Sequence, residues 1–251
     1  MKAVVIIPAR YNSLRFPGKV LADLNGKPIV QHVYERVAGM MEEVYVATDD
    51  ERISAAVTSF GGKAVMTSSA HPSGTDRCAE ACRLLYGGSS RPDVVLNVQA
   101  DEPFIETDAL QSLIACFRDE KIRIATLARR IDSGAALSDP NIVKVVTGQD
   151  GRALYFSRAP VPYLRNANGG DPAKQFGYLM HLGIYAYRYQ VLQDITRLPG
   201  SALEMAESLE QLRWLEYGYG IHVALTDMEG IGIDTREDLE AARNLLSSGN
   251  G

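Results

Sequence analysis

Three cationic side chains, those of Arg10, Arg15 and Lys19, lie close together near the start of the chain. Such side chains can donate charge-assisted hydrogen bonds to several phosphate oxygens, and Ser13 and Gly18 let backbone N–H groups approach an anion. The segment matches neither the Walker pattern G-x-x-x-x-G-K-[ST] nor the dinucleotide pattern G-x-G-x-x-G, which disfavours ATPase and NAD sites. The sequence therefore predicts a polyphosphate site, the alternative being a solvated basic turn.

Two aspartates follow short apolar runs at distant places in the chain. Asp101 comes after residues 94–98, and Asp234 comes after residues 230–233. Carboxylates at strand ends can converge on one cation, and Mg²⁺ prefers a few carboxylates together with waters and substrate phosphates. This pattern indicates a magnesium site that assembles around a nucleoside triphosphate. The alternatives are a turn residue for Asp101 and a helix N-cap for Asp234.

The apolar runs before these side chains predict the framework that positions them. The run at 3–8 is rich in β-branched residues and suits a central parallel strand, whose carboxyl end is where open α/β sheets bind ligands. Apolar periodicity over 29–37 and 110–117 indicates amphipathic helices between strands. We therefore expect a Rossmann-like α/β fold with a mostly parallel sheet flanked by helices. Further strands are expected at 44–48, 63–66 and 94–98.

The pattern changes at about residue 122, where apolar runs follow one another with little helix between them. This change predicts a smaller, more antiparallel, β-rich sub-lobe over about 122–190, within a single domain that covers 1–251. The turn-rich segment at 166–171 is expected to lie over a site or to be mobile. Helices are expected again at about 202–217 and 235–246. The β-rich runs are 124–128, 143–146, 153–156 and 184–187.

Composition limits the class of protein. The 251 residues carry a net charge of −5, which gives no global footprint for nucleic-acid binding. Cys78, Cys82 and Cys116 are an odd number with no paired C-x-x-C, which argues against a disulfide framework or a structural zinc site. The sequence has no signal-like segment and no apolar stretch of about 18 residues, so we expect a cytoplasmic protein without membrane insertion.

Longer motifs resemble the 3-deoxy-D-manno-octulosonate cytidylyltransferases, also called CMP-Kdo synthetases. The resemblance starts at Arg15-Phe16-Pro17-Gly18-Lys19, within the segment 10–19 that carries the three cations and is called the cationic loop below, and it covers nearly the whole chain in order. Ala100 stands where that family usually has Gly, and a backbone that needed a positive φ would be strained there. The other matching segments are residues 20–29, 73–77, 97–103, 155–160, 181–188, 209–213 and 233–235.

The resemblance implies a nucleotidyltransferase that transfers CMP from CTP to Kdo and releases pyrophosphate, giving the activated sugar for lipopolysaccharide biosynthesis. It implies that Asp101 and Asp234 bind Mg²⁺ and act with Lys19 in catalysis, and a second Mg²⁺ would accompany the triphosphate. It also implies a homodimer, whose surface the β-rich part could provide with Trp214, Tyr217 and Tyr219 nearby.

The same resemblance assigns the CTP site. An arginine in the first turn of a helix, as at Arg77, suggests an external anion or base edge, because the helix dipole does not favour a cation there. A plain helix cap at Ser73 is the alternative. The residues that the resemblance places at CTP are Ala9, Arg10, Arg15, Lys19, Ser73, Gly74, Thr75 and Arg77.

The acid-sugar pocket is also assigned by resemblance, to Gln99, Arg158, His181, Tyr185, Glu210 and Gln211. Arg158 suits the sugar carboxylate because its planar fork can bind it bidentately. The alternatives are an interface arginine, a structural histidine, a buried tyrosine hydroxyl and a solvated helix face. Rival functions are a cytidylyltransferase for 8-amino-Kdo or sialate, and a nucleotide sensor without enzymatic activity.

Overall fold

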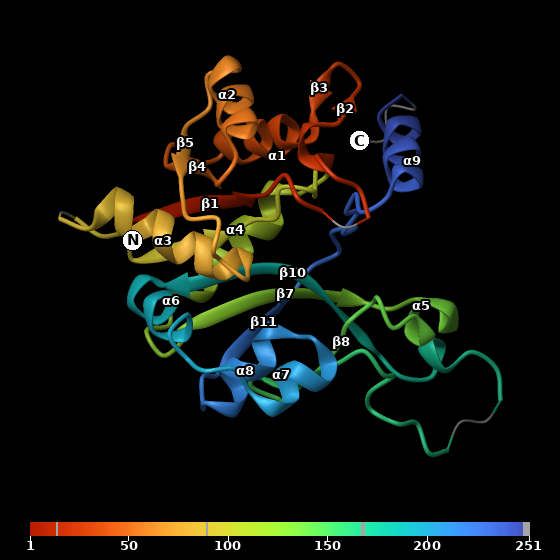
Figure 1. The fold of residues 1–251 in the computed structure, drawn as a ribbon. Helices are drawn as coiled ribbons and strands as arrows, with labels where there is room; N and C mark the ends of the chain where they lie inside the picture. The colour runs from red at the N-terminus through yellow and green to blue at the C-terminus, as the bar shows by residue number, and fades with distance from the viewer. Residues whose placement is uncertain (14, 89, 167–168, 248–251) are drawn as a thin grey trace. The chain divides into compact units, whose positions relative to one another are not determined.

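The computed structural model describes residues 1–13, 15–88, 90–166 and 169–247, which form two compact units (Figure 1). The first unit comprises Met1–Leu110 and Glu229–Gly251, and the second comprises Gln111–Met228. Helix α4 (Thr107–Cys116) contains the boundary between them. The turn-rich segment predicted at 166–171 includes residues 167–168, which lie outside the described residues.

The first unit is built on a parallel sheet in the order β6, β1, β4, β5. In β1, Ile6 pairs with Asn97 of β6 on one side and with Tyr45 of β4 on the other. Val4 to Ile7 are fully buried, as expected for a central strand covered on both faces. The predicted fold class is therefore confirmed. The strands are β1 (Ala3–Ala9), β4 (Val44–Thr48), β5 (Ala64–Met66) and β6 (Val94–Asn97).

Helices cover both faces of this sheet. In Figure 1, α1 lies above β1 and α3 lies below it. Gly74 opens α3, and a Cβ there would lie 3.2 Å from Cγ of Pro8, so glycine lets the helix start close to the end of β1. The remaining elements of this unit are α1 (Ile29–Ala38), α2 (Glu51–Ser59), α3 (Gly74–Tyr86), α9 (Arg236–Ser247), the 3-10 turn η1 (Lys19–Leu21) and a small antiparallel pair, β2 (Asp23–Leu24) with β3 (Lys27–Pro28).

The second unit is mainly antiparallel. Its longest strand, β10, pairs antiparallel with β7 and with β8, which in turn pairs antiparallel with β9, while β11 pairs parallel with β7. Its strands are β7 (Ile124–Arg130), β8 (Lys144–Thr147), β9 (Ala153–Ser157), β10 (Leu179–Arg188) and β11 (Ile221–Leu225). Its helices are α5 (Gly134–Ser138), η2 (Pro172–Lys174), α6 (Tyr189–Ile195), α7 (Ala202–Glu207) and α8 (Glu210–Glu216).

Two predicted elements have different bounds. The single helix expected at 202–217 is wrong, because α7 ends at Glu207, its C-cap Ser208 has left-handed φ and ψ of 51° and 49°, and α8 begins at Glu210. The strand expected at 184–187 starts earlier, at Leu179, with a register shift between Leu182 and Tyr185. Among the described residues, no helix has the length and apolar character needed to cross a membrane.

Candidate active site

A cavity of about 310 Å³ opens at the carboxyl end of β1, within the first unit. The predicted phosphate, metal and helix-start residues line it together, although they come from distant parts of the sequence. Of the predicted CTP residues, all except Thr75 line this cavity. The lining residues are Pro8, Ala9, Arg10, Ser13, Arg15, Lys19, Val20, Pro72, Ser73, Gly74, Arg77, Gln99, Ala100, Asp101 and Asp234.

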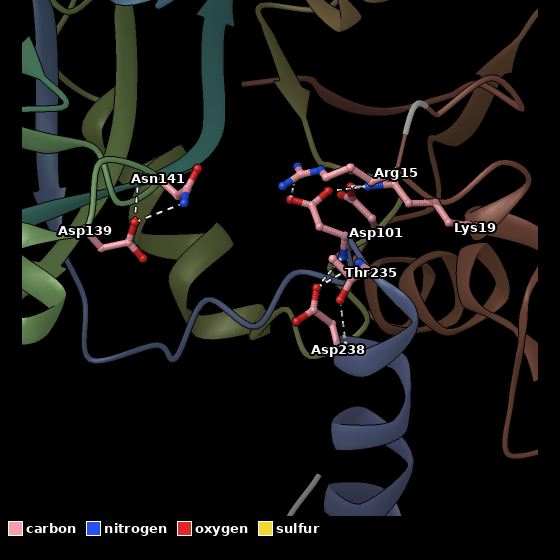
Figure 2. Close-up of polar contacts among 8 residues, drawn as sticks. Arg15, Lys19, Asp101, Asp139, Asn141, Thr235 and Asp238 are labelled. Atoms are coloured by element: carbon pink, nitrogen blue, oxygen red, sulfur yellow. Dashed lines mark hydrogen bonds and ion pairs between the residues drawn. The ribbon is translucent and has the colours of Figure 1, made fainter.

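The ammonium group of Lys19 joins the two aspartates. Its Nζ donates a hydrogen bond to Oδ2 of Asp101 and a second, of 2.7 Å, to Oδ1 of Asp234. Arg15 donates from Nη2 to the other oxygen of Asp234 at 2.7 Å (Figure 2). The two carboxylates therefore do converge on one cation, which in this structure is a lysine ammonium.

Lys19 keeps its charge in this setting. Burial by itself lowers the pKa of its ammonium, but the charges of Asp101 and Asp234 and their hydrogen bonds together outweigh burial, so the pKa is raised above its usual 10.5. The Lys19 side chain is only 12% exposed, whereas that of Arg15 is 62% exposed. Water screens the Arg15 ion pair much more than the Lys19 pairs, so Arg15 is free to leave Asp234 at little cost.

Backbone contacts hold the two carboxylate-bearing segments beside each other. The N–H of Ile233 donates to the carbonyl of Asp101 at 2.9 Å. Asp234 is the next residue after Ile233, so this bond keeps Asp234 close to Asp101. Ala100 does not have a positive φ, so alanine is not strained at this turn.

The N-cap of α9 is formed by Thr235 and Asp238, not by the side chain of Asp234. Oδ2 of Asp238 accepts from the N–H groups of Asp234 and Thr235 at 3.0 and 2.8 Å, and Thr235 Oγ1 accepts from the N–H of Asp238 at 3.1 Å (Figure 2). The carboxylate of Asp234 is therefore left for Lys19 and Arg15. The alternative interpretation of Asp234 as the helix N-cap is therefore wrong.

Two residues that line the cavity near the start of α3, Ser73 and Arg77, are hydrogen-bonded to other protein groups. Arg77 is 5% exposed, donates from Nη1 to Thr67 Oγ1 at 2.7 Å and pairs with Asp49 at 3.1 Å. Ser73 caps α3 by accepting from the N–H of Asp76 at 3.2 Å. Sequence reasoning missed Asp49. Its position just after β4, the strand beside β1, was an available signal.

Among the predicted sugar residues, Gln99 lines the cavity of the first unit and the others belong to the second unit. Arg158 donates from Nε to the carbonyl of Glu207 at 2.7 Å, from Nη2 to that of Ser208 at 3.3 Å, and from Nη1 to that of Pro140 at 2.9 Å. The neighbours of Pro140 in the chain contact each other, because the N–H of Asn141 donates to Oδ1 of Asp139 at 2.8 Å (Figure 2). Arg158 thus ties the end of β9 to two loops, while Nη1 and Nη2 each retain a second N–H group.

His181 and Tyr185 lie together on β10, with ring centroids 5.2 Å apart. Thr126 donates its hydroxyl proton to the carbonyl of Ile184, so its Oγ1 accepts from His181 Nε2 at 2.9 Å. This contact fixes the Nε2–H form of the ring. Burial lowers the pKa of His181 to about 3, so the ring is neutral.

Tyr185 is buried beside Trp214 and near Glu210. Burial and then the charge of Glu210 raise the pKa of the Tyr185 hydroxyl well above its usual 10. The Tyr185 Oη and the Trp214 Nε1 have no hydrogen-bond partner within the described part of the chain. Glu210 pairs with Arg213 at 2.8 Å, and Gln211 is 5% exposed. The structure thus groups His181, Tyr185 and Glu210.

The neutral ring of His181 predicts how stability changes with pH. An unfolded chain protonates His181 near pH 6.5, whereas the folded chain resists protonation down to about pH 3. The unfolded state therefore binds more protons in this window, and the free energy of unfolding should fall as the pH falls, by at most about 1.4 kcal/mol per pH unit. Urea unfolding at several pH values measures the slope. The contribution of His181 to this slope should be missing in His181→Gln and present in the control variant His222→Gln. Equal slopes in the parent and in His181→Gln would contradict the lowered pKa of His181.

Comparison with known proteins gives one consistent result. The family model described as cytidylyltransferase matches residues 4–227. The 3-deoxy-manno-octulosonate cytidylyltransferase of Bacteroides thetaiotaomicron is 54% identical over 251 residues, 99% of either chain. The enzyme of that name from Phocaeicola vulgatus is 53% identical over 254 residues, with both chains fully covered.

Solved structures agree with these matches. A CMP:2-keto-3-deoxy-manno-octonic acid synthetase complexed with CTP is 45% identical, has a TM-score of 0.90, and covers 99% of this chain and 100% of its own. A 4-diphosphocytidyl-2C-methyl-D-erythritol synthase from Anaerococcus prevotii has a TM-score of 0.63 at 13% identity, with 98% of each chain covered. The second likeness concerns the fold alone.

Proposed function

The chain belongs to the cytidylyltransferase family, and we propose that it transfers CMP from CTP to 3-deoxy-D-manno-octulosonate, giving CMP-Kdo and pyrophosphate. The observation that carries this proposal is full-length similarity to relatives of that name, at 54% and 53% identity. The chemistry of the first-unit cavity supports it, because cations and carboxylates meet there as a nucleoside triphosphate requires. The anomeric hydroxyl of the sugar attacks the α-phosphorus, and pyrophosphate leaves with the electrons of the broken P–O bond.

In this proposal the cationic loop binds the triphosphate. Arg10, Arg15 and Lys19 line one cavity and donate to phosphate oxygens, which neutralises the charge that builds up on the leaving pyrophosphate. In this structure Arg15 and Lys19 donate hydrogen bonds to the two aspartates. Phosphate oxygens would attract these two cations away from the carboxylates. Binding of CTP would thereby release Asp101 and Asp234 for a different cation.

The donor set fits Mg²⁺. Asp101 and Asp234 provide carboxylate oxygens that already meet at one cation position, and Mg²⁺ completes its shell with waters and substrate phosphates. When bound there, Mg²⁺ would act as a Lewis acid on the α-phosphate and lower the pKa of the sugar hydroxyl. The protein's own part is to hold the two carboxylates in place, through the Ile233 to Asp101 backbone bond and the Thr235 and Asp238 cap.

We propose that the acid sugar is recognised by Gln99 and by the second-unit residues Arg158, His181, Tyr185, Glu210 and Gln211. Their chemistry suits a polyhydroxylated acid, because Arg158 retains N–H groups for a carboxylate and Tyr185 has an unpartnered hydroxyl. His181, as the neutral Nε2–H form, keeps its Nδ1 lone pair as an acceptor for a hydroxyl group.

Arg158 gives a prediction that separates the two substrates. Arg158→Ala should raise the KM for Kdo at least tenfold, because losing a charged partner of a carboxylate costs about 2 to 5 kcal/mol. CTP affinity, measured by calorimetry without sugar, should stay close to the parent value. Arg158→Lys should recover only part, since an ammonium cannot reproduce the planar fork.

The structure adds a control to this prediction. Arg158 also holds Glu207 and Ser208 by their carbonyls, so thermal unfolding of each variant must be compared with the parent. Poor CTP binding with normal use of Kdo would place Arg158 in the nucleotide site. It would contradict the proposed assignment of Arg158 to the sugar site.

The proposed activity is tested by pyrophosphate release from purified protein. Release should require CTP, Kdo and Mg²⁺ together, and EDTA should abolish it. ATP or UTP in place of CTP, and sialate or 8-amino-Kdo in place of Kdo, test both substrate assignments in the same assay. Absence of pyrophosphate release with CTP and Kdo would exclude the proposal. Release only with another acid sugar would show that the enzyme is a cytidylyltransferase for that sugar.

We propose further that the enzyme is a cytoplasmic homodimer. Apolar side chains on the surface of the second unit support an interface there: Leu154 is 64% exposed, Tyr163 87% and Tyr217 46%. Trp214, which sequence analysis placed near such a surface, is 1% exposed and belongs to the core. Sedimentation velocity should give twice the chain mass of 27.4 kDa. A monomer at micromolar concentration would contradict the dimer.

A further inference from the structure

We propose that Arg52, in the first turn of α2, is a positioning residue for the cationic loop and acts through the ring of Tyr11. The inference rests on the proposed function, because the loop that Arg52 holds is the proposed triphosphate site. Arg52 does not line the cavity, and no motif used above includes it. It is nevertheless connected to the loop by a short series of contacts within the first unit.

The first contacts fix the guanidinium group itself. Arg52 donates from Nε and Nη2 to the two carboxylate oxygens of Asp50, at 2.9 and 2.6 Å. Asp50 is in turn fixed as the N-cap of α2, where it accepts the N–H of Arg52 at 2.9 Å. A bidentate pair of this kind sets the plane of the guanidinium group as well as its position.

The guanidinium carbon of Arg52 lies 3.4 Å from the centroid of the Tyr11 ring. Arginine favours such a position because a guanidinium group can stack on the electron-rich face of an aromatic ring. Tyr11 is the second residue of the cationic loop, directly after Arg10. The orientation of Arg52 therefore determines where the start of the loop can lie.

Tyr11 also holds the end of the loop. Its carbonyl accepts the N–H of Gly18 at 2.8 Å, and its ring lies so close to Gly18 that a Cβ there would be 2.9 Å from Cε2. Gly18 has a φ of +72°, which other residues rarely adopt, so glycine suits this position for two reasons. The next residue is Lys19, whose ammonium lies between the two aspartates.

These contacts form one series, from Asp50 through Arg52, Tyr11 and Gly18 to Lys19. Arg10, Arg15 and Lys19 carry like charges on one loop, and Asp101 and Asp234 compensate those of Arg15 and Lys19. The contacts of Arg52 and Tyr11 therefore act as a brace that holds the loop in addition to these ion pairs. A brace formed in advance reduces the ordering that CTP must impose on binding. Because the Arg52 side chain is 60% exposed, its ion pair contributes little to global stability. Removing it should loosen the loop and leave the fold intact.

The expected result for Arg52→Ala is an increase of about fivefold in the KM for CTP, the factor that corresponds to about 1 kcal/mol. The kcat at saturating CTP and the KM for Kdo should change less than twofold. Arg52→Lys should recover part of the loss, because an ammonium can lie over the ring without reproducing the bidentate pair. Tyr11→Phe should behave like the parent, since the ring and the backbone carbonyl remain. Arg118→Ala removes another exposed arginine and serves as the matched control.

A second measurement does not depend on activity. The Gly18 amide, bonded to the Tyr11 carbonyl, should exchange its hydrogen at least about fivefold faster in Arg52→Ala than in the parent, and saturating CTP should reduce the difference. Tyr11→Ala should show the same increase, and adding Arg52→Ala to it should give no further effect, because both residues act through one contact.

The outcomes separate this inference from the proposed function. Parent-like exchange at Gly18 and a parent-like KM for CTP in Arg52→Ala would overturn the positioning role while leaving the activity in place. Additive effects of the Arg52 and Tyr11 substitutions would also overturn it. If the protein did not use CTP, the exchange experiment without nucleotide would still show whether Arg52 holds the loop.

Discussion

Replacing Asp101 or Asp234 by asparagine is expected to lower kcat by on the order of a hundredfold or more, because each substitution removes a charged ligand from the proposed metal site. The two carboxylates lie against the same ammonium in this structure, so both contribute oxygens to one cation position. The fold should remain intact, since the backbone bond from Ile233 and the cap formed by Thr235 and Asp238 do not use these side chains. Steady-state rates at saturating CTP and Kdo measure the loss.

Two further measurements show whether the fall in kcat comes from loss of metal binding. Glu237→Gln removes an exposed carboxylate three residues beyond Asp234 and should keep the parent rate, which makes it the matched control. Titration with Mn²⁺ in the presence of CTP, followed by electron paramagnetic resonance, should show weaker binding in both asparagine variants. Near-normal rates and parent-like Mn²⁺ binding in both variants would mean that the metal lies elsewhere.

Replacing Lys19 by alanine is expected to reduce kcat/KM for CTP by about a hundredfold, because a buried cation that meets phosphate is lost. The KM for Kdo should change far less. The same substitution should have the opposite effect on metal binding without nucleotide, since the exposed Arg15, which pairs with Asp234, is then the cation that remains bonded to these carboxylates among the described residues. Mn²⁺ should therefore bind the nucleotide-free variant more tightly than the nucleotide-free parent.

The opposite directions of these two effects make the prediction specific. A general loss of structure at the cavity would weaken both CTP use and metal binding. A loss confined to the KM for Kdo would show that the cationic loop does not bind the triphosphate. Arg15→Ala is the comparison variant, and its effect on metal binding should be smaller because its pair with Asp234 is exposed to water.

Much of the first unit was predictable from the chain itself. The apolar run that forms β1, and the rule that ligands lie at the carboxyl ends of parallel strands, placed the cationic loop and Asp101 at one edge of the sheet. For Asp234 the expected strand end is wrong, because residues 230–234 form no strand and Ile233 is the one buried residue among them, yet the structure still brings this carboxylate to Lys19. Strand-end position was informative for the cationic loop and Asp101, because it depends on local pattern and on one general rule of topology.

Contacts that depend on side-chain packing between distant segments were not predictable. The pairing of Arg77 with Asp49, and the attachment of Arg158 to the carbonyls of Glu207 and Ser208, join residues that no periodicity links. The interruption of the helix at Ser208 could not be predicted, because no proline or glycine lies there. The start of α7 does carry a sequence signal, the capping box formed by Ser201 and Glu204. The brace from Arg52 to Tyr11 is of the same kind, because it depends on where α2 meets the loop.

The central claim is that this enzyme forms a bond between the α-phosphorus of CTP and Kdo. Phosphorus NMR of one reaction containing CTP, Kdo and Mg²⁺ tests it most directly, because the phosphodiester of CMP-Kdo and free pyrophosphate give separate signals. We expect both signals to grow in equal amounts as the CTP signals decline, with no CMP or CDP formed by the enzyme itself. Pyrophosphate accompanied by free CMP, CDP with inorganic phosphate, or an unchanged CTP spectrum would contradict the account.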